Sequence, residues 1–408
     1  MSFVSHIECT VCGQRHEAGR LLTVCEACGQ MLAVRYDLAK VAAAVTKDAL
    51  RLRPPGMYRF RELVPLADGE EPVALGEGGT PLLELALVAG VRVLAKVESA
   101  NPTLSFKDRP VSVAATVAAA HGAQGLLCAS TGNTAVAVAA YAARAGLPAV
   151  CVVPDGTPPA KLALALATGA AVLPVRGSYS DAHALARELA ARGAWANLTS
   201  TYLNPYMLEG DKTLAFEVVE QLGGRPPDAF VVPVGAGPLL AGVAQGLEEL
   251  GLAARVHAVQ AAGCAPIARA FAAGGEVVAW DRPPDTAAGS IADPLHGYAA
   301  DGQRTLDCVR ESGGAAVAAP DAALRAAARE LAETAGLSVE LGAAAALAGL
   351  RELRGDGRVA DGETVVLVLT GHGVKDHAPA DGAGRALAAV DPADVAGAER
   401  ALEAVGRG

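Results

Sequence analysis

Lys107 is the residue in this sequence whose type and position best suit covalent chemistry. It follows a hydrophobic run typical of a strand, residues 91–97, and precedes an Ala- and Val-rich run typical of a helix, residues 110–121. A lysine at such a junction lies at the open end of a sheet, where burial lowers the pKa of its amine and makes it nucleophilic toward carbonyls. A Schiff-base lysine needs these properties. Because a single lysine is more often a solvated surface charge, the assignment depends on the neighbouring loops.

Three further loops place glycine and hydroxyl groups directly after an apolar run. Ser130-Thr-Gly-Asn-Thr134 opens a helical run, so its hydroxyl and backbone N–H groups form an anion site suited to a carboxylate. Gly235-Ala-Gly-Pro-Leu239 has the arrangement by which a glycine-rich turn binds a phosphate. Thr370 places a hydroxyl at the end of another buried strand, residues 364–369. Taken singly, each loop is also explained by turn formation and helix capping.

Together these segments resemble the threonine synthase branch of the fold-type II pyridoxal 5′-phosphate (PLP) enzymes. Six motifs occur in the family's order, spread over residues 75–376, and this argues strongly against a chance similarity. They are Gly76-Glu-Gly-Gly-Thr-Pro-Leu82, Asn101-Pro-Thr-Leu-Ser-Phe-Lys-Asp-Arg109, Ser130-Thr-Gly-Asn-Thr134, Asn204-Pro-Tyr-Met-Leu-Glu-Gly-Asp-Lys-Thr213, Pro233-Val-Gly-Ala-Gly237 and Thr370-Gly-His-Gly-Val-Lys-Asp376.

The resemblance implies a role for each loop. Lys107 would hold PLP as a Schiff base and move protons, Asn133 would bond the phenolic oxygen, and Thr370 would face the pyridine nitrogen. The cofactor phosphate would lie on Gly235, Ala236, Gly237 and Leu239. The substrate carboxylate would lie on Ser130, Thr131, Gly132 and Thr134. A neutral hydroxyl leaves the pyridine nitrogen largely unprotonated, which suits elimination and replacement at the β or γ carbon better than transamination.

The sequence departs from this family mainly where the leaving group would lie. Threonine synthases generally have Arg where this chain has Met207, and tend to have Asn where it has Ala236. Leu104 replaces a usual glycine, and Pro238 removes a donor from the phosphate turn. The cofactor-directed residues are thus kept while the leaving-group residues are exchanged. The predicted leaving-group pocket contains Gly79, Thr201, Tyr202, which is bulkier than expected, and Met207.

Four of the eight cysteines form two C-x-x-C-G motifs, with Cys9 and Cys12 in the first and Cys25 and Cys28 in the second. This spacing matches a tetrahedral thiolate zinc site, in which each glycine allows a tight turn. Four cysteine ligands leave no open position, so the zinc would be structural. Free thiols and, less favoured in a cytosolic chain, two disulfides are the alternatives; His16 would be a ligand only if one cysteine is out of reach. Similar N-terminal knuckles occur in some threonine synthases.

The composition is that of a metabolic enzyme rather than a nucleic-acid or membrane protein. The 408 residues are 52% hydrophobic but only 4% aromatic, so Ala, Val and Leu build the core. A net charge of -10 argues against a nucleic-acid partner. The run at residues 1–8 lacks the basic and apolar regions of a secretory signal, and apolar runs such as 135–143 are too short to cross a bilayer. We therefore expect a cytoplasmic protein with no membrane partner.

Strand-like and helix-like runs alternate from about residue 91 to 369, which predicts doubly wound sheets. With the family resemblance, the expected fold is α/β, with two doubly wound α/β domains of PLP fold type II and an N-terminal zinc-ribbon-like segment. Residues 279–305 show no period, which predicts a long loop or irregular crossover over the active site. The expected domains are a ribbon-like segment at 1–37, a large PLP-binding domain at 38–110 and 207–380, a small α/β domain at 111–206 and a C-terminal tail at 381–408.

Three functions fit this sequence. The first is PLP-dependent elimination or replacement at the β or γ carbon of an amino-acid substrate through Lys107, with a leaving group other than a simple phosphate. The second is a genuine threonine synthase, which converts O-phosphohomoserine to threonine and has rebuilt its phosphate site, with Lys212 and Arg109 as possible cations. The third is a non-catalytic zinc-ribbon binding protein on an enzyme scaffold, against which the retention of Lys107, Asn133 and Thr370 argues. A homodimer is expected for the enzyme.

Overall fold

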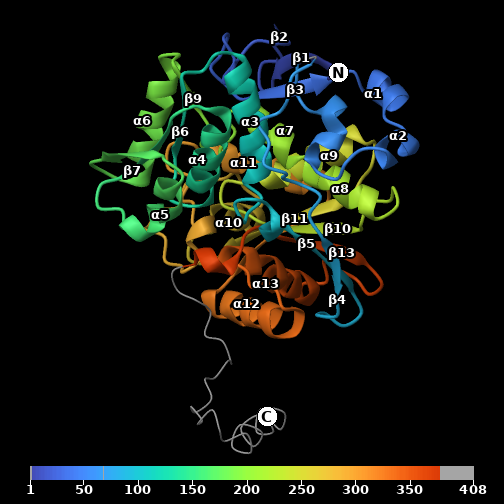
Figure 1. Ribbon diagram of the computed structural model, residues 1–408. Coiled ribbons are helices and arrows are strands. Elements are labelled where there is room, and N and C mark those ends of the chain that lie inside the picture. The colour runs from blue at the N-terminus through green and yellow to red at the C-terminus, as the bar shows by residue number, and fades with distance from the viewer. Residues whose placement is uncertain (1, 68, 377–408) are drawn as a thin grey trace, which may run out of the picture.

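The computed structural model of the protein describes residues 2–67 and 69–376. The predicted tail at 381–408 lies outside the described residues. Within the described part of the chain, helices connect a three-stranded, a six-stranded and a four-stranded sheet, which confirms the predicted α/β fold (Figure 1). None of the helices in this part has the length and apolar composition needed to span a bilayer.

The six-stranded sheet has the order β12-β11-β10-β13-β5-β4 and is parallel except for β4. Its strands are β4 (Leu82–Leu85), β5 (Arg92–Val97), β10 (Ala229–Pro233), β11 (Arg255–Ala261), β12 (Ala316–Ala319) and β13 (Thr364–Leu369). One face packs on α12 (Asp321–Ala335) and α13 (Leu341–Gly355), and the other on α8 (Thr213–Gln221), α9 (Pro238–Glu249), α10 (Pro266–Ala273) and α11 (Ala299–Glu311). Because both faces are covered, the central strands are continuous apolar runs.

The four-stranded sheet is parallel, has the order β8-β7-β6-β9 and lies beside the larger sheet (Figure 1). Its strands are β6 (Gly125–Ala129), β7 (Ala149–Pro154), β8 (Ala171–Val175) and β9 (Trp195–Asn197). One face packs on α3 (Asp108–Ala120), α4 (Asn133–Ala145) and α5 (Pro159–Ala167), and the other on α6 (Tyr179–Ala191). Successive residues of β6, such as Leu126 and Leu127, therefore enter different cores.

The strands of each sheet fall within the sequence segments assigned to the two domains. Those of the four-stranded sheet lie within 111–206, and those of the six-stranded sheet lie within 38–110 and 207–380. The assigned limits at 110/111 and 206/207 fall inside α3 and α7 (Pro205–Asp211), so these helices connect the two sheets. The domain limits themselves stay a prediction.

The prediction that residues 279–305 form a long loop or irregular crossover holds as far as residue 298 and is wrong at the end of the segment. A short 3-10 helix, η3 (Gly289–Ile291), interrupts the segment, and α11 begins at Ala299. The first turn of α11 contains Asp301 and Gly302, whose low helix propensity hid it in the sequence. Packing decides in favour of the helix, because Leu306 and Val309 on its apolar face are buried against the six-stranded sheet.

The N-terminal segment is an antiparallel sheet of the order β2-β1-β3, formed by β1 (Val4–Cys9), β2 (Arg15–Glu17) and β3 (Leu32–Tyr36). It lies against α7, where the hydroxyl of Tyr206 donates to the carbonyl of Arg20 at 2.6 Å. The hydroxyl of Tyr36 donates to the carboxylate of Glu209 at 2.5 Å. Beyond β3 the chain forms α1 (Leu38–Ala44), α2 (Lys47–Arg51) and the 3-10 helix η1 (Met57–Leu63).

Leu104 explains why glycine is usual at its position in the family. Its φ angle is 63°, in the left-handed region that costs an L-residue other than glycine about 1–2 kcal/mol. The turn is nevertheless held by two backbone bonds, from the N–H of Leu104 to Asn101 at 2.8 Å and from the N–H of His372 to Leu104 at 3.1 Å. The strained turn therefore lies three residues before Lys107.

Candidate active site

Lys107 occupies the turn between β5 and α3, as the sequence predicts. Its amine donates a hydrogen bond to Ser200 and lies 4.1 Å from the centroid of the Phe106 ring. Burial lowers the pKa of Lys107 to about 8, while the negative charges of Asp211, Asp293 and Glu340 oppose this shift. The amine is therefore more often uncharged near neutral pH than an exposed lysine, which is the state that attacks a carbonyl.

Thr370 lies beside the lysine turn because β5 and β13 are parallel neighbours. The carbonyl of Thr370 accepts from the N–H of Phe106 at 3.0 Å, and Ser105 and Gly371 form an isolated bridge. The side chain of Thr370 is 6% exposed. The structure therefore brings Thr370 and Lys107 together, as the sequence predicts.

Asn133 is joined to two charged residues. Its amide nitrogen donates to both carboxylate oxygens of Glu340 at 2.9 and 3.0 Å, and its amide oxygen accepts from Lys375 at 2.7 Å. Burial raises the pKa of Glu340 to about 7 although Asn133 and Lys375 favour its charged form. Burial also lowers the pKa of Lys375, which lies in the 3-10 helix η4 (Gly373–Lys375).

Sequence reasoning missed these two partners of Asn133. Lys375 falls within the motif at Thr370–Asp376 and could have been found there. Glu340 directly precedes α13 with no motif around it, so no signal in the sequence marks it. The structure shows it against Gly371, where an added Cβ would lie 2.8 Å from the Glu340 carboxyl carbon.

The predicted carboxylate site lies at the N-terminus of α4. Gly132 is the N-cap, no side chain caps this helix, and the hydroxyl of Ser130 accepts from the N–H of Gly132 at 3.2 Å. The loop is tied to Lys107 through Thr199, whose hydroxyl accepts from the N–H of Ala129 at 2.9 Å and which precedes Ser200. Thr131 is half-buried and Thr134 is buried. Uncapped N–H groups at the start of a 13-residue helix suit an anion.

The predicted phosphate turn lies between β10 and α9. Gly237 has a φ angle of 105°, and a Cβ there would lie 2.2 Å from the hydroxyl of Thr305, so only glycine fits. That hydroxyl donates to the carbonyl of Ala236 at 2.6 Å. Pro238 is the first residue of α9, a position that needs no N–H, so it does not disturb the helix. Leu239, in the same turn of helix, is buried.

The four residues of the predicted leaving-group pocket have different surroundings in the structure. Tyr202 is 1% exposed, its hydroxyl pairs with that of Thr305 at 2.9 Å, and it therefore lies next to the phosphate turn. Thr201 is 2% exposed, and Met207, at 1%, packs in the core shared by α3 and α4. Gly79 instead lies beside Gly56, whose backbone nitrogen is 3.1 Å from where a Cβ on Gly79 would be.

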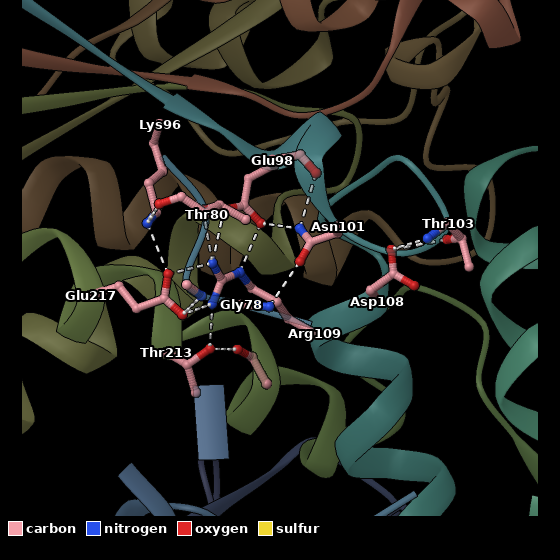
Figure 2. A network of polar contacts seen from close by, with 12 residues as sticks. Gly78, Thr80, Lys96, Glu98, Asn101, Thr103, Asp108, Arg109, Thr213 and Glu217 are labelled. Atoms are coloured by element: carbon pink, nitrogen blue, oxygen red, sulfur yellow. Dashed lines mark hydrogen bonds and ion pairs between the residues drawn. The ribbon is translucent and has the colours of Figure 1, made fainter. Parts of the chain in front are cut away.

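Arg109 and Lys212 do not serve as free cations, so their predicted role in phosphate binding is wrong. Arg109 is 0% exposed and forms ion pairs with Glu98 and Glu217, both at 2.7 Å (Figure 2). Lys212 is also 0% exposed and pairs with Glu209 at 2.5 Å and Glu249 at 2.8 Å. Buried cations need such partners because an unpaired charge in the interior is costly.

The ion pairs of Arg109 belong to a buried network that supports the lysine turn (Figure 2). Glu217 also accepts from the amine of Lys96 and from the N–H of Gly79, both at 2.8 Å. Asn101 accepts from the N–H of Gly78 at 2.9 Å and donates to Glu98 at 2.8 Å. The network therefore fixes the loop at 76–82 and the turn at 101–109 relative to α8.

Asp211 is a buried carboxyl group that sequence reasoning missed. It is 1% exposed, and its Oδ1 accepts no hydrogen bond from the described residues. It follows Gly210, which contacts α3 so closely that an added Cβ would lie 2.1 Å from the carbonyl oxygen of Arg109. Burial raises the pKa of Asp211 to about 7, and among the carboxylates acting on Lys107 its charge has the largest effect.

We expect Asp211→Asn to lower the pKa of Lys107 below its value of about 8. Removing a negative charge destabilises the neighbouring ammonium, so the free amine appears at lower pH. The measurement is the rate at which added PLP binds covalently to cofactor-free protein between pH 6 and 10, whose midpoint should move to lower pH. Asp301→Asn is the matched control, since Asp301 is also buried but is not among the carboxylates that act on Lys107. An unchanged midpoint in Asp211→Asn would contradict the expectation.

The four cysteines of the two knuckles form one cluster. Their Sγ atoms all lie within 4.8 Å of one another. The two knuckles have the same form, since Gly13 and Gly29 both have φ of 70° and donate to the carbonyls of Cys9 and Cys25 at 3.1 and 2.8 Å. His16 is not part of the cluster; its Nδ1 lies 3.6 Å from Glu26. Four thiol groups this close fit a tetrahedral zinc ion.

Purified protein should contain one zinc ion per chain, held by Cys9, Cys12, Cys25 and Cys28. Removing it should lower the melting temperature, because the binding free energy of a structural zinc ion is also folding free energy. Elemental analysis and thermal unfolding before and after chelation measure both effects. Below the new melting temperature, turnover should be largely kept. A chelator that stops turnover while leaving the melting temperature unchanged would assign the metal to catalysis instead.

Comparison with known proteins agrees with this geometry. A family model described as pyridoxal-phosphate dependent enzyme matches residues 73–371. A threonine synthase from Methanosarcina acetivorans is 37% identical over 382 residues, which cover 91% of this chain and 92% of the relative. One from Mycobacterium tuberculosis is 40% identical over 333 residues, which cover 79% of this chain and 89% of the relative.

Solved structures of related enzymes share the fold. A T.th. threonine deaminase has a TM-score of 0.61 and 30% identity and covers 72% of this chain and 92% of its own. A fungal L-serine ammonia-lyase from Rhizomucor miehei has a TM-score of 0.63 and 25% identity and covers 74% of this chain and 95% of its own. The family match spans the turns of Lys107, Asn133, Gly235 and Thr370. The chain therefore belongs to the pyridoxal-phosphate dependent enzymes of fold type II, in their threonine synthase-like branch.

Proposed function

We propose that the protein catalyses PLP-dependent elimination or replacement at the β or γ carbon of an amino acid, and that the leaving group is not a simple phosphate. One observation carries the second part. Asp211, Asp293 and Glu340 act on Lys107 with negative charge, while Arg109 and Lys212 are consumed by buried ion pairs. A second dianion beside the cofactor phosphate would meet carboxylates rather than a free guanidinium, which is unfavourable in a desolvated site.

The residues present fit PLP, since no side chain caps the start of α9 directly after the turn at Gly235–Gly237, and Lys107 is desolvated. In this assignment Lys107 holds the cofactor, the turn at Gly235–Gly237 with Leu239 holds its phosphate, and Asn133 and Thr370 contact the ring. PLP supplies the electron sink for the substrate α carbon. Lys107 accepts the α proton and returns it, aided by its pKa of about 8. The N-terminus of α4 at Ser130–Thr134 holds the substrate carboxylate.

A genuine threonine synthase is the second candidate, because the relatives compared above carry that name at 37% and 40% identity. A zinc-ribbon binding protein without catalysis is the third. An absorbance spectrum of the purified protein distinguishes this third candidate from the two enzymes, because bound PLP would make either enzyme yellow. We also propose a homodimer, which a sedimentation measurement tests.

O-Phosphohomoserine should be a poor substrate. Removing one partner of a desolvated charge pair costs about 2–5 kcal/mol, so the specificity constant should be about thirty- to several-thousand-fold below that for the preferred substrate. The test is steady-state release of threonine and phosphate from O-phosphohomoserine, beside a panel of β- and γ-substituted amino acids. Efficient turnover by the unmodified protein would establish the threonine synthase reaction instead.

A variant with Met207→Arg and Ala236→Asn tests the same idea by restoring the usual family residues. It should gain activity on O-phosphohomoserine relative to the unmodified protein. Because Met207 is 1% exposed, circular dichroism must first show that the variant folds. Ala236→Asn alone is the companion variant, and its smaller gain would separate the amide from the guanidinium.

A further inference from the structure

Asp293 lies directly against the predicted phosphate turn. It follows η3, and its Cβ is 3.3 Å from the position that a Cβ on Gly235 would occupy. Its charge is also among those that act on Lys107. None of the six family motifs contains this residue.

The carboxylate of Asp293 is held in one orientation. Its Oδ1 accepts from the N–H of Leu295 at 3.0 Å and from the hydroxyl of Tyr298 at 2.7 Å. Leu295 is fully buried and has a φ of 58°, a strained conformation that persists only where the surroundings enforce it. The ring of Tyr298 stacks on that of His183 with centroids 4.7 Å apart, which ties this corner to α6.

The second oxygen of Asp293, Oδ2, accepts no hydrogen bond from the described residues, and the side chain is half-buried rather than sealed in the interior. Burial raises the pKa of Asp293, and the hydrogen bonds from Leu295 and Tyr298, together with the weaker effects of His296 and Lys107, offset this shift only in part. The surrounding protein therefore disfavours the charge of this carboxylate. Carboxylates in such an environment gain most from a ligand that brings a positive charge and N–H donors.

We propose that Asp293 is the specificity-determining residue for the distal group of the substrate, and that this group is a protonated amine on the β or γ carbon. The inference rests on the proposed PLP-dependent function and narrows its substrate class to diamino acids. In this arrangement the free oxygen of Asp293 accepts from the distal ammonium, while the α-carboxylate lies at the start of α4. A substrate that carries a phosphate group in place of this distal ammonium would bring it against the carboxylate of Asp293 and bind more weakly.

The test is titration of the holoenzyme with amino acids while the absorbance of the bound cofactor is followed. The panel contains 2,3-diaminopropionate and 2,4-diaminobutyrate, their hydroxyl counterparts serine and homoserine, and O-phosphoserine. We expect each diamino acid to bind at least tenfold more tightly than its hydroxyl counterpart, about 1.4 kcal/mol. In Asp293→Asn this preference should disappear. Asp307→Asn, a half-buried acid that accepts from Gln303 at 2.7 Å, is the matched control and should keep it.

Each outcome decides between the two proposals. Equal binding of diamino acids and hydroxyl counterparts to the unmodified protein would overturn the inference but leave PLP chemistry in place. Tighter binding of PLP by Asp293→Asn, with unchanged selectivity, would show that Asp293 faces the cofactor phosphate. A spectrum that no amino acid perturbs would reject the proposed function itself. If Asp293→Asn fails to fold, the unmodified protein still gives an answer, because equal binding of diamino acids and their hydroxyl counterparts would overturn the inference.

Discussion

Lys107→Ala should lose turnover by about 10³-fold or more while keeping the fold. Removal of a positioned proton-transfer group alone typically costs about 10²–10⁴-fold, and this lysine is also the proposed attachment point of PLP. Its side chain makes one hydrogen bond, to Ser200, and takes no part in the buried ion-pair network of the described residues. Circular dichroism and thermal unfolding should therefore match those of the unmodified protein. Initial rates on the preferred substrate measure the loss.

Borohydride reduction provides the independent check on Lys107. The reduced cofactor should be recovered on the peptide that contains Lys107, and on no other. Lys96 and Lys212 are the internal controls, because both are buried but engaged with carboxylates. Recovery of the label on Lys96, Lys161 or Lys212 would reject the assignment of the active-site lysine.

Glu217→Gln should destabilise the protein by about 3–5 kcal/mol. The carboxylate is 3% exposed and pairs with Arg109 at 2.7 Å and Lys96 at 2.8 Å (Figure 2). Removing one partner from a buried ion pair leaves uncompensated charge, and here two cations lose their shared anion. Urea denaturation, followed by circular dichroism, measures the decrease in the free energy of unfolding.

Glu84→Gln is the control for Glu217→Gln. Glu84 pairs with Arg92 at 2.8 Å, but both side chains are more than half exposed, at 61% and 51%. Exposed ion pairs contribute about 0–1 kcal/mol, so this variant should unfold almost as the unmodified protein does. Equal effects of the two substitutions would show that the buried network does not carry the stability assigned to it.

The parts of the fold that the sequence predicted are those set by local pattern. Apolar runs between glycine-rich turns marked the strands around Lys107, Ser130 and Gly235, because a strand buried on both faces must be continuously apolar. The knuckle spacing placed Cys9, Cys12, Cys25 and Cys28 in one cluster, which the structure shows. These features can be predicted from the sequence because residues close together in the chain determine them.

The parts that the sequence did not predict depend on contacts between distant segments. Arg109 and Lys212 look like free cations in the sequence, and only the fold shows their partners Glu217 and Glu249. Asp293 and Glu340 have no motif around them, and their charges act on Lys107 although both lie far from it in the sequence, after η3 and directly before α13. Charge pairing between segments far apart in the sequence leaves no periodic signal.

The buried carboxyl groups shift the dependence of stability on pH in opposite directions. Arg109 and Lys96 hold the pKa of Glu217 at about 2 against burial, so its contribution is complete above about 4.5 and is lost as the pH falls toward 2. Asp211 and Glu340 have pKa values of about 7, so cofactor-free folded protein binds protons more readily than unfolded chain and gains stability as the pH falls from 7. In the cofactor-free protein these two carboxyl groups therefore favour folding more strongly in mild acid than in mild alkali, and the candidate active site is a part of the molecule that opposes its own ionisation.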